Sequence, residues 1–233
     1  MSVKPAPMTH SPTPRPSTRW LVAAVALAAV AGLLWRFPLV RIRRLDATAT
    51  KSTFDPRDFA ERHWANDLLP ALDAARDAGE VMAAIRRDAT EACRSLGRSV
   101  GLSRSCLYLV RGQGTIAEVG PSGCRVVLDG DAGEALLATG LVFGTAIRDI
   151  TGTVDPASRT DSRELAAAAS EINRLVQERV IAPLASEAKA GSRIEFVACG
   201  QVQGTLPQGK PWKLTPVRIT LQEAPTASEG TGP

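Results

Sequence analysis

The feature that most constrains this chain is an uninterrupted apolar run near its N-terminus. The run extends from Trp20 to Trp35 and holds sixteen residues without a charge. As a helix it would be about 24 Å long, against about 30 Å for the hydrocarbon core of a bilayer. Residues 36–40 extend it if Arg36 reaches back to the lipid headgroups. We therefore expect a membrane-spanning anchor over residues 19–40.

A secretory signal that is cleaved after export is the competing interpretation, because Arg15 and Arg19 precede the run. Cleavage needs small residues after the apolar stretch, but residues 36–39 are Arg, Phe, Pro and Leu. The first cysteine is Cys93, so no lipid-attachment cysteine follows the run. An uncleaved signal-anchor is therefore the favoured interpretation.

The basic character of the chain belongs to the anchor. Residues 1–45 hold seven Lys and Arg and no acidic residue, whereas the whole chain has a formal net charge of +4. Subtracting these seven charges leaves −3 for residues 46–233. A mildly acidic domain with one tyrosine argues against nucleic-acid binding. Three basic residues precede the run and four follow it, which slightly favours a cytoplasmic C-terminal domain.

Composition divides the rest of the chain into tails, a linker and one domain. Residues 1–18 and 223–233 are rich in Pro, Ser, Thr or Gly, without apolar periodicity, and are predicted to be disordered. Residues 41–53 form a linker. Residues 54–222 are long enough for a single domain with its own core.

Two helical regions open this domain. Asp55 is placed to cap a helix, with Pro56 at the first helical position. A second helical region opens at Pro70, and its apolar residues recur at spacings of three and four. Gly79 is expected to break that region and Gly97 to end it.

The remaining pattern predicts strands and one more helix. Short β-like runs separated by turn signals occupy residues 106–140 and indicate a β-meander. A third helix is expected over residues 161–190, kinked or split by Pro183. Two last strands follow at 193–202 and 212–221. This order predicts an α+β fold with an antiparallel sheet.

The four cysteines show no metal-binding or redox spacing, and with two histidines in the chain we expect no metal and no cofactor. Cys93 and Cys106 would close a short loop between a helix and a strand. We favour buried free thiols for all four, including Cys124 and Cys199, with the Cys93–Cys106 disulfide as the alternative.

Four sequence blocks, taken together, resemble a bacterial family of unknown function described as predicted periplasmic lipoproteins. The blocks are FDPRDFAERHWANDLLP at 54–70, YLVRGQGTI at 108–116, GLVFGTAIRD at 140–149 and PVRITL at 216–221. Two departures are visible. A lipoprotein cysteine is missing, and the stretch after the third block reads DPASRTDSRELA.

The resemblance implies small OB-like barrel units, one or two in number, with packed helices. It also implies a periplasmic accessory or binding protein associated with a sugar ABC transport system, whose partners are transporter components or a sugar. On this basis we expect a single-pass inner-membrane protein whose C-terminal domain lies in the periplasm. The charge count above conflicts with that orientation.

Two groups of residues are candidates for a ligand or partner site. Arg111, Gly112 and Gly114 lie in a strand interrupted by glycine, which marks either close backbone approach to a ligand or a β-bulge. The second group is a polar cluster in an otherwise apolar β segment, to which one residue of the third helix could be added. An internal ion pair is the more ordinary interpretation of this second group, which comprises Thr145, Arg148, Asp149 and Asn173.

Enzymatic function is not expected. His10 lies in the predicted tail and His63 beside a tryptophan, so no histidine-supported nucleophile is visible. Trp64 and Trp212 could stack on a sugar ring, but core packing is favoured. The alternatives to a binding protein are an envelope scaffold without a small ligand and an uncharacterised hydrolase.

Overall fold

The structure, a computed structural model, describes residues 54–99, 105–154 and 161–222. The predicted anchor, linker and tails lie outside these ranges. The chain divides into two compact units, Met1–Lys51 and Ser52–Pro233, and every described element belongs to the second. Among the described residues, no helix combines the length and apolarity needed to cross a bilayer.

The first described helix, α2 (Pro56–His63), begins as the sequence predicts. The Asp55 side chain accepts hydrogen bonds from backbone N–H groups of the first turn. Pro56, at the first helical position, has no N–H group that would need an acceptor. The chain then widens into a π turn, η1 (Trp64–Leu68), and returns to α-helix in α3 (Leu69–Leu72).

A proline follows each of two π turns at the same spacing. Pro70 comes six residues after Trp64, where η1 begins. Pro183 comes six residues after Gln177, the first residue of the π turn η3 (Gln177–Ile181). In a regular α-helix, proline cannot donate the hydrogen bond to the carbonyl four residues back, and its ring crowds that carbonyl. The wider π turn accommodates the proline, so each helix continues past it. The prediction that Pro70 opens a new helix is therefore wrong.

The long helix consists of α7 (Ser162–Val176), η3 and α8 (Ala182–Glu187), close to the predicted residues 161–190. Asp161 caps it by accepting a hydrogen bond from the Arg163 backbone N–H, at 2.9 Å. The break expected at Pro183 is replaced by the π turn, which keeps the chain helical through the proline.

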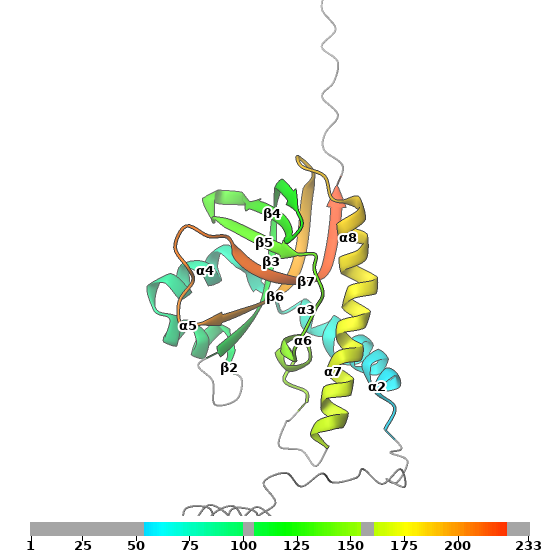
Figure 1. The fold of residues 1–233 in the computed structure, drawn as a ribbon. Coiled ribbons are helices and arrows are strands. Elements are labelled where there is room, and N and C mark those ends of the chain that lie inside the picture. The colour runs from blue at the N-terminus through cyan, green and yellow to red at the C-terminus, as the bar shows by residue number, and fades with distance from the viewer. Residues whose placement is uncertain (1–53, 100–104, 155–160, 223–233) are drawn as a thin grey trace, which may run out of the picture. The chain divides into compact units, whose positions relative to one another are not determined.

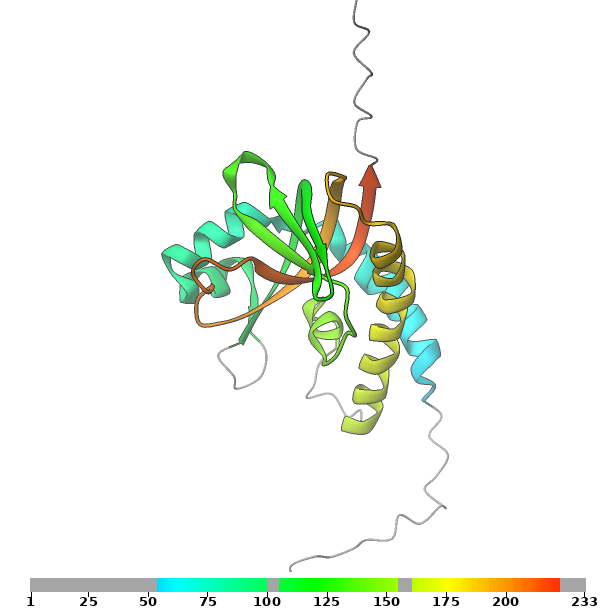
Figure 2. The same ribbon diagram turned by 45° about the horizontal axis from the view of Figure 1, so that its top comes forward.

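α2 lies beside α7, as Figure 2 shows in cyan and yellow-green. Arg179 of η3 joins α2 to the long helix. Its guanidinium donates to both carboxylate oxygens of Glu61, at 2.7 and 2.8 Å. It also lies 5.3 Å from the centre of the Trp64 ring. The two π turns therefore contact each other through a cation–π pair.

Two short helices, α4 (Ala78–Arg87) and α5 (Ala89–Leu96), follow α3. Gly79 was predicted to break this region, but it is the second residue of α4. A Cβ at Gly79 would lie 2.5 Å from the Cβ of Ala132, so glycine serves here for close packing. The predicted stop at Gly97 is confirmed, because α5 ends there.

The described strands form one sheet of seven, and five of them close into a ring (Figure 1). The ring order is β3-β4-β5-β7-β6, and β6 pairs again with β3. β3, β4 and β5 are consecutive antiparallel neighbours, which confirms the predicted meander, whereas β5 and β7 are parallel. The strands are β1 (Arg76–Asp77), β2 (Arg98–Ser99), β3 (Ser105–Gly120), β4 (Gly123–Leu128), β5 (Glu134–Ala138), β6 (Arg193–Gln203) and β7 (Trp212–Gln222).

The ring corrects one detail of the predicted sheet. One ring occurs in the described part of the chain, which is within the one or two units that were expected. The runs expected as separate strands at 106–110 and 114–119 are one continuous strand, β3, so the glycines between them do not interrupt it. The irregularity of β3 lies further along, between Ile116 and Glu118.

β3 and β6 separate two hydrophobic cores. Side chains alternate along a strand, so Tyr108 and Phe196 face the core shared with α4 and α5. Leu107 and Val197 face the core shared with α2 and α7. The two helix pairs thus cover opposite faces of the same strands, and all four side chains are at most 4% exposed.

One disulfide joins α5 to β3. Cys93 and Cys106 are bonded, which corrects the expectation of free thiols for this pair. Cys124 and Cys199 are free and buried, as predicted. Burial raises the pKa of both free thiols, that of Cys199 to about 12, so neither is a thiolate near neutral pH.

Candidate functional site

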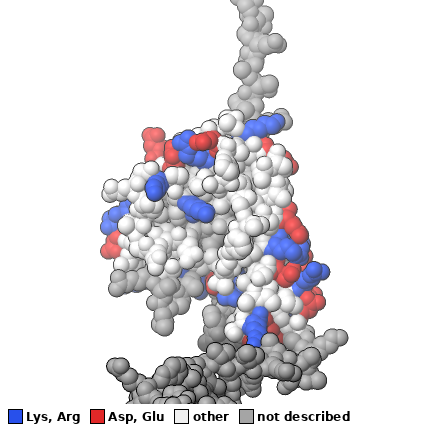
Figure 3. Space-filling model, viewed as in Figure 1, with Lys and Arg blue, Asp and Glu red and all other residues white. Residues whose placement is uncertain are grey.

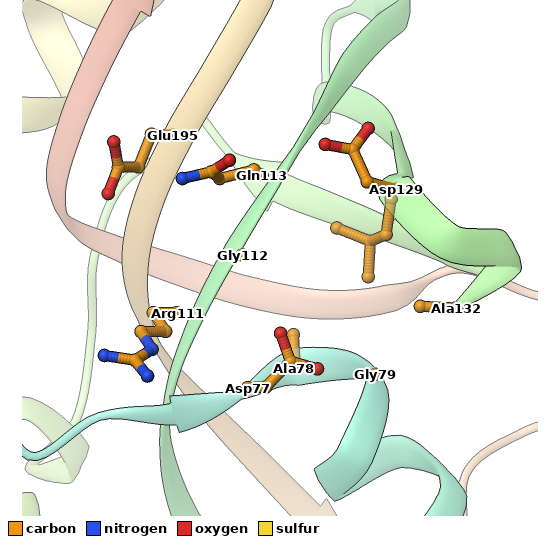
Figure 4. A pocket seen from close by; sticks show the side chains of 10 residues that line it. Asp77, Ala78, Gly79, Arg111, Gly112, Gln113, Asp129, Ala132 and Glu195 are labelled. Atoms are coloured by element: carbon orange, nitrogen blue, oxygen red, sulfur yellow. The ribbon is translucent and has the colours of Figure 1, made fainter.

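One candidate site is a cavity of about 220 Å³ at the start of α4, called here the β3 pocket (Figure 4). Its walls come from β3, β6, the first turn of α4 and the 3₁₀ turn η2 (Asp129–Asp131). The polar side chains of the β3 pocket are those of Asp77, Arg111, Gln113, Asp129 and Glu195.

Strand register brings these polar side chains together. Arg111 and Gln113 are two residues apart on β3 and are therefore on the same face. Glu195 on β6 is the register partner of Gln113, and Asp77 on β1 is that of Arg111. Figure 4 shows Arg111, Gln113 and Glu195 on one side of β3 and Asp129 on the other. Three strands thus contribute to one small site.

Three of these side chains have no partner among the residues that the structure describes. Arg111, Gln113 and Glu195 are exposed and make no side-chain hydrogen bond or ion pair to the described residues. Asp77, by contrast, caps α4 by accepting from the Glu80 backbone N–H, at 3.0 Å. A guanidinium, an amide and a carboxylate therefore remain available, which together supply both donors and acceptors.

Asp129 is occupied by an ion pair at the edge of the pocket. Arg193 donates to both of its carboxylate oxygens, at 2.7 Å each. The hydrogen-bonded guanidinium holds the pKa of Asp129 below its usual range. Asp129 therefore remains ionised and bound to Arg193 at neutral pH and is not free to bind a ligand.

The glycines predicted for this site serve packing. A Cβ at Gly112 would lie 2.6 Å from the Phe196 ring, and one at Gly114 would lie 2.2 Å from the Val127 carbonyl oxygen. Gly112 lines the pocket, whereas Gly114 lies outside it. The close approach is therefore to neighbouring parts of the protein, and the bulge interpretation does not apply at either glycine.

The second predicted group, called here the α6 network, is assembled around α6 (Ala146–Ile150). The prediction of a β segment here is wrong, because Arg148 and Asp149 lie on this short helix. The favoured internal ion pair is confirmed, with Arg148 Nε donating to Asp149 Oδ1 at 2.7 Å. Arg148 and Asp149 are 6% and 8% exposed, so the pair is buried.

Further hydrogen bonds satisfy most of the α6 network. Thr145 donates to the second Asp149 oxygen at 2.6 Å, and Arg148 Nη1 donates to the Leu165 carbonyl at 2.9 Å. Asn173, which is 8% exposed, donates to the Gly144 carbonyl at 2.9 Å. The network thus ties α6, α7 and the loop before α6 together, with its ion pair buried and Thr145 exposed at its edge.

That loop borders a groove of about 530 Å³ along α7. Leu141 and Phe143 at its lip are 73% and 79% exposed, the most exposed large apolar side chains among the described residues. Figures 1 and 2 show the loop passing beside α7. We call this feature the α7 groove. Residues 141–145 form one side, and the other side is formed by Ala166, Ala169 and Asn173 of α7 with Gln177 of η3.

The two predicted residue groups thus lie at two separate places. Arg111 and Gly112 line the β3 pocket, whereas Thr145 and Asn173 line the α7 groove. Sequence reasoning missed Gln113 and Glu195. Gln113 could have been found from its spacing of two from Arg111, whereas Glu195 is brought in by strand pairing.

The described residues show no assembled nucleophile. His63 is 2% exposed, with Nδ1 3.0 Å from Asp67 and Nε2 without a partner, so no hydroxyl or thiol is bonded to it. Trp64 and Trp212 are 8% and 4% exposed, which confirms their place in the core. In the same ranges no cluster of three or more His, Cys, Asp or Glu could hold a metal ion.

The ring order and its helices define an α+β domain of OB-like type. A crystal structure of an OB-fold protein from Thermotoga maritima is similar over 72% of this chain and 99% of that one, with 24% sequence identity and a TM-score of 0.63. At this identity the likeness shows the fold alone. A comparison with curated proteins gave no match.

The chain belongs to the DUF2291 family, described as predicted periplasmic lipoproteins, which matches residues 21–220. The predicted resemblance is therefore confirmed, and the family description supports a periplasmic, membrane-associated location. The match begins within the apolar run, and this chain has no cysteine there.

Proposed function

We propose that this protein is a non-enzymatic periplasmic binding module, tethered to the inner membrane, that binds a small polyhydroxylated ligand in the β3 pocket. Its biological role is that of an accessory to a sugar ABC transport system. The single-pass anchor over residues 19–40 and the periplasmic orientation of the domain are parts of this proposal.

The observation that carries the proposal is the set of side chains around one small cavity that have no partner in the described part of the chain, those of Arg111, Gln113 and Glu195. Sugar hydroxyls both donate and accept hydrogen bonds. A guanidinium supplies donors, a carboxylate supplies acceptors, and an amide supplies both. The cavity volume of about 220 Å³ is below the range typical of drug-sized ligands, which favours a single sugar ring.

Titration calorimetry of the full-length protein in detergent, with ribose, other pentoses and hexoses, tests this proposal. We expect at least one sugar to bind, and Arg111→Ala and Glu195→Ala each to weaken its binding by about tenfold or more. The reason is that hydrogen bonds to charged groups contribute about 1.5–3 kcal/mol, and 1.4 kcal/mol is a factor of ten in affinity.

Arg76→Ala is the matched control. Arg76 is exposed, lies on the neighbouring strand β1 opposite Val110 and does not line the β3 pocket. It should leave the sugar affinity unchanged. The proposal is abandoned if no sugar binds the wild-type protein and a pull-down with the components of a sugar ABC transport system from the same cell recovers none of them.

A further inference from the structure

A cavity of about 300 Å³ lies where two short strands join the edge of β3. Arg76 of β1 and Arg98 of β2 pair with positions 110 and 107 of β3. Because β6 covers the other edge of β3, both arginines lie along the same edge, about 10 Å apart for three residues of strand. Both line this cavity, which we call the arginine cavity.

The remaining walls of the arginine cavity are largely apolar. Leu107 and Leu109 are two residues apart on β3 and therefore lie on the same face, where Ile150 of α6 belongs to the same core. Leu96 of α5 and Ala71 of α3 add further apolar surface. A ligand in this cavity would therefore contact hydrocarbon as well as two guanidinium groups.

The two arginines of this cavity are not neutralised by the protein. Most arginines among the described residues form an ion pair, and Figure 3 shows such pairs as adjacent blue and red side chains along the margin formed by α7 and α2. Arg76 and Arg98 are exposed and form no side-chain hydrogen bond or ion pair with the described residues. Among the described residues that line the arginine cavity, none is acidic.

Arg98 is placed by packing and not by a carboxylate. A Cβ at Gly152 would lie 2.2 Å from the guanidinium carbon of Arg98, so this group lies directly on the backbone that follows α6. Gly152 has φ +71°, a conformation that glycine adopts at little cost. A ligand could therefore bind this cation without displacing an internal partner.

Arg76 also lines a neighbouring cavity, which contains the carboxylates of Asp73, Asp77 and Glu80. Asp73 pairs with Arg218 at 3.4 Å, and Asp77 caps α4. Arg76 forms an ion pair with none of these three carboxylates. Because like charges repel, an anion should bind Arg76 from the side of the arginine cavity, where no carboxylate lines the wall.

We propose that the arginine cavity binds a small soluble phosphate monoester with an apolar body. Arg76 and Arg98 would hold the phosphate, and the apolar body would lie on Leu107 and Leu109. A phosphate monoester carries about −1.5 to −2 charges at pH 7, which matches two guanidinium groups better than the single charge of a carboxylate. Guanidinium groups also bind phosphate oxygens in a bidentate manner.

The size of the cavity favours a soluble ligand. Its volume of about 300 Å³ is at the lower end of the range typical of ligand pockets, which favours a small molecule over a lipid with two acyl chains. This inference goes beyond the proposed sugar binding, because the arginine cavity and the β3 pocket share no lining residue. Its test therefore does not depend on whether a sugar binds.

Titration calorimetry of the full-length protein in a non-ionic detergent, with phenyl phosphate as the probe, tests the inference. We expect phenyl phosphate to bind, and Arg76→Gln and Arg98→Gln each to weaken its binding by about tenfold or more, because each removes a charged hydrogen-bond donor. Inorganic phosphate lacks the apolar body and benzoate carries one charge, so both should bind more weakly. Added salt should weaken the binding of phenyl phosphate.

Arg163→Gln is the matched control. Arg163 is exposed, has no side-chain partner among the described residues and lies on α7, outside the arginine cavity. This variant loses the same charge and should leave the affinity for phenyl phosphate unchanged. All three arginines are exposed, so their replacement should leave the far-UV circular dichroism unchanged.

Three results would overturn the inference. The first is a wild type that does not bind phenyl phosphate, and the second is binding that survives unchanged in Arg76→Gln/Arg98→Gln. The third is tighter binding of benzoate or of dihexanoyl phosphatidic acid than of phenyl phosphate, which would point to a carboxylate or a lipid headgroup instead of a soluble phosphate monoester.

Discussion

The α6 network and the β3 pocket contain the same kinds of side chain in opposite circumstances. Arg148 and Asp149 are buried and bonded to each other, with further bonds to the backbone and to Thr145. Arg111 and Glu195 are exposed and have no partner among the described residues. Both sites contain an arginine and a carboxylate, but only in the β3 pocket are these groups available to bind a ligand.

This contrast separates a structural role from a binding role. A buried charge that loses its partner is strongly destabilising, so removing one member of the α6 ion pair should destabilise the fold. An exposed, unpaired charge contributes little to stability, because water solvates it in both the folded and unfolded states. The presence of an arginine beside a carboxylate therefore says little about function until burial and bonding are known.

Among the substitutions considered, breaking the α6 network should lower the free energy of unfolding the most. Arg148→Ala leaves the Asp149 carboxylate buried without its cation, which should lower the free energy of unfolding by about 3–5 kcal/mol. Urea unfolding of the full-length protein, followed by far-UV circular dichroism, measures this change. Arg174→Ala removes a solvent-accessible arginine with two ion pairs and should lower the free energy of unfolding much less than Arg148→Ala does. Equal losses in the two variants would erase the distinction between buried and exposed pairs.

Protonation of His63, which lies at the edge of the α6 network, should have a smaller effect on the free energy of unfolding. Burial lowers the pKa of His63 below 6.5, and Asp67 offsets this only in part. Arg148 opposes the imidazolium and Asp149 favours it, while the Phe59 ring stacks on the histidine at 5.9 Å between centres.

The lowered pKa of His63 determines in which direction stability changes with pH. The unfolded chain binds the His63 proton more readily, so this contribution to stability is intact above pH 6.5 and declines as the pH falls toward the folded-state pKa. Unfolding experiments from pH 8 to pH 5 should show wild type losing stability relative to His63→Gln below pH 6.5. A constant difference between the two proteins across this range would contradict the prediction.

Removing the unpaired charges of the β3 pocket should have the smallest effect on folding. Arg111→Ala and Glu195→Ala should each change the free energy of unfolding by less than about 0.5 kcal/mol, because both side chains are exposed and unbonded. The same urea experiment measures this. A loss above 1 kcal/mol in either variant would show that the pocket residues support the fold, and the contrast with Arg148 would then disappear.

Local signals in the sequence predicted helix ends well. The caps at Asp55 and Asp161 and the stop at Gly97 depend on side chains within a few residues of the helix end, and each was found where expected. The same local reasoning failed at Pro70, because a π turn accommodates the proline and packing decides whether one forms.

Long-range pairing accounts for what the sequence could not predict. Gln113 meets Glu195 across eighty-two residues of sequence, and the ring closes by pairing β3 with β6. The segment containing Arg148 looked like a strand because its apolar residues form a short run, yet it folds as α6 against α7. Short apolar runs do not distinguish a strand from one buried helical turn.

The disulfide between Cys93 and Cys106 makes the maturation of the domain depend on the redox state of the compartment in which it folds. Such bonds persist in oxidising compartments and are rare where glutathione keeps thiols reduced. A chain retained in the cytosol would lack the covalent tie between α5 and β3, so laboratory preparations should come from exported material or an oxidising host.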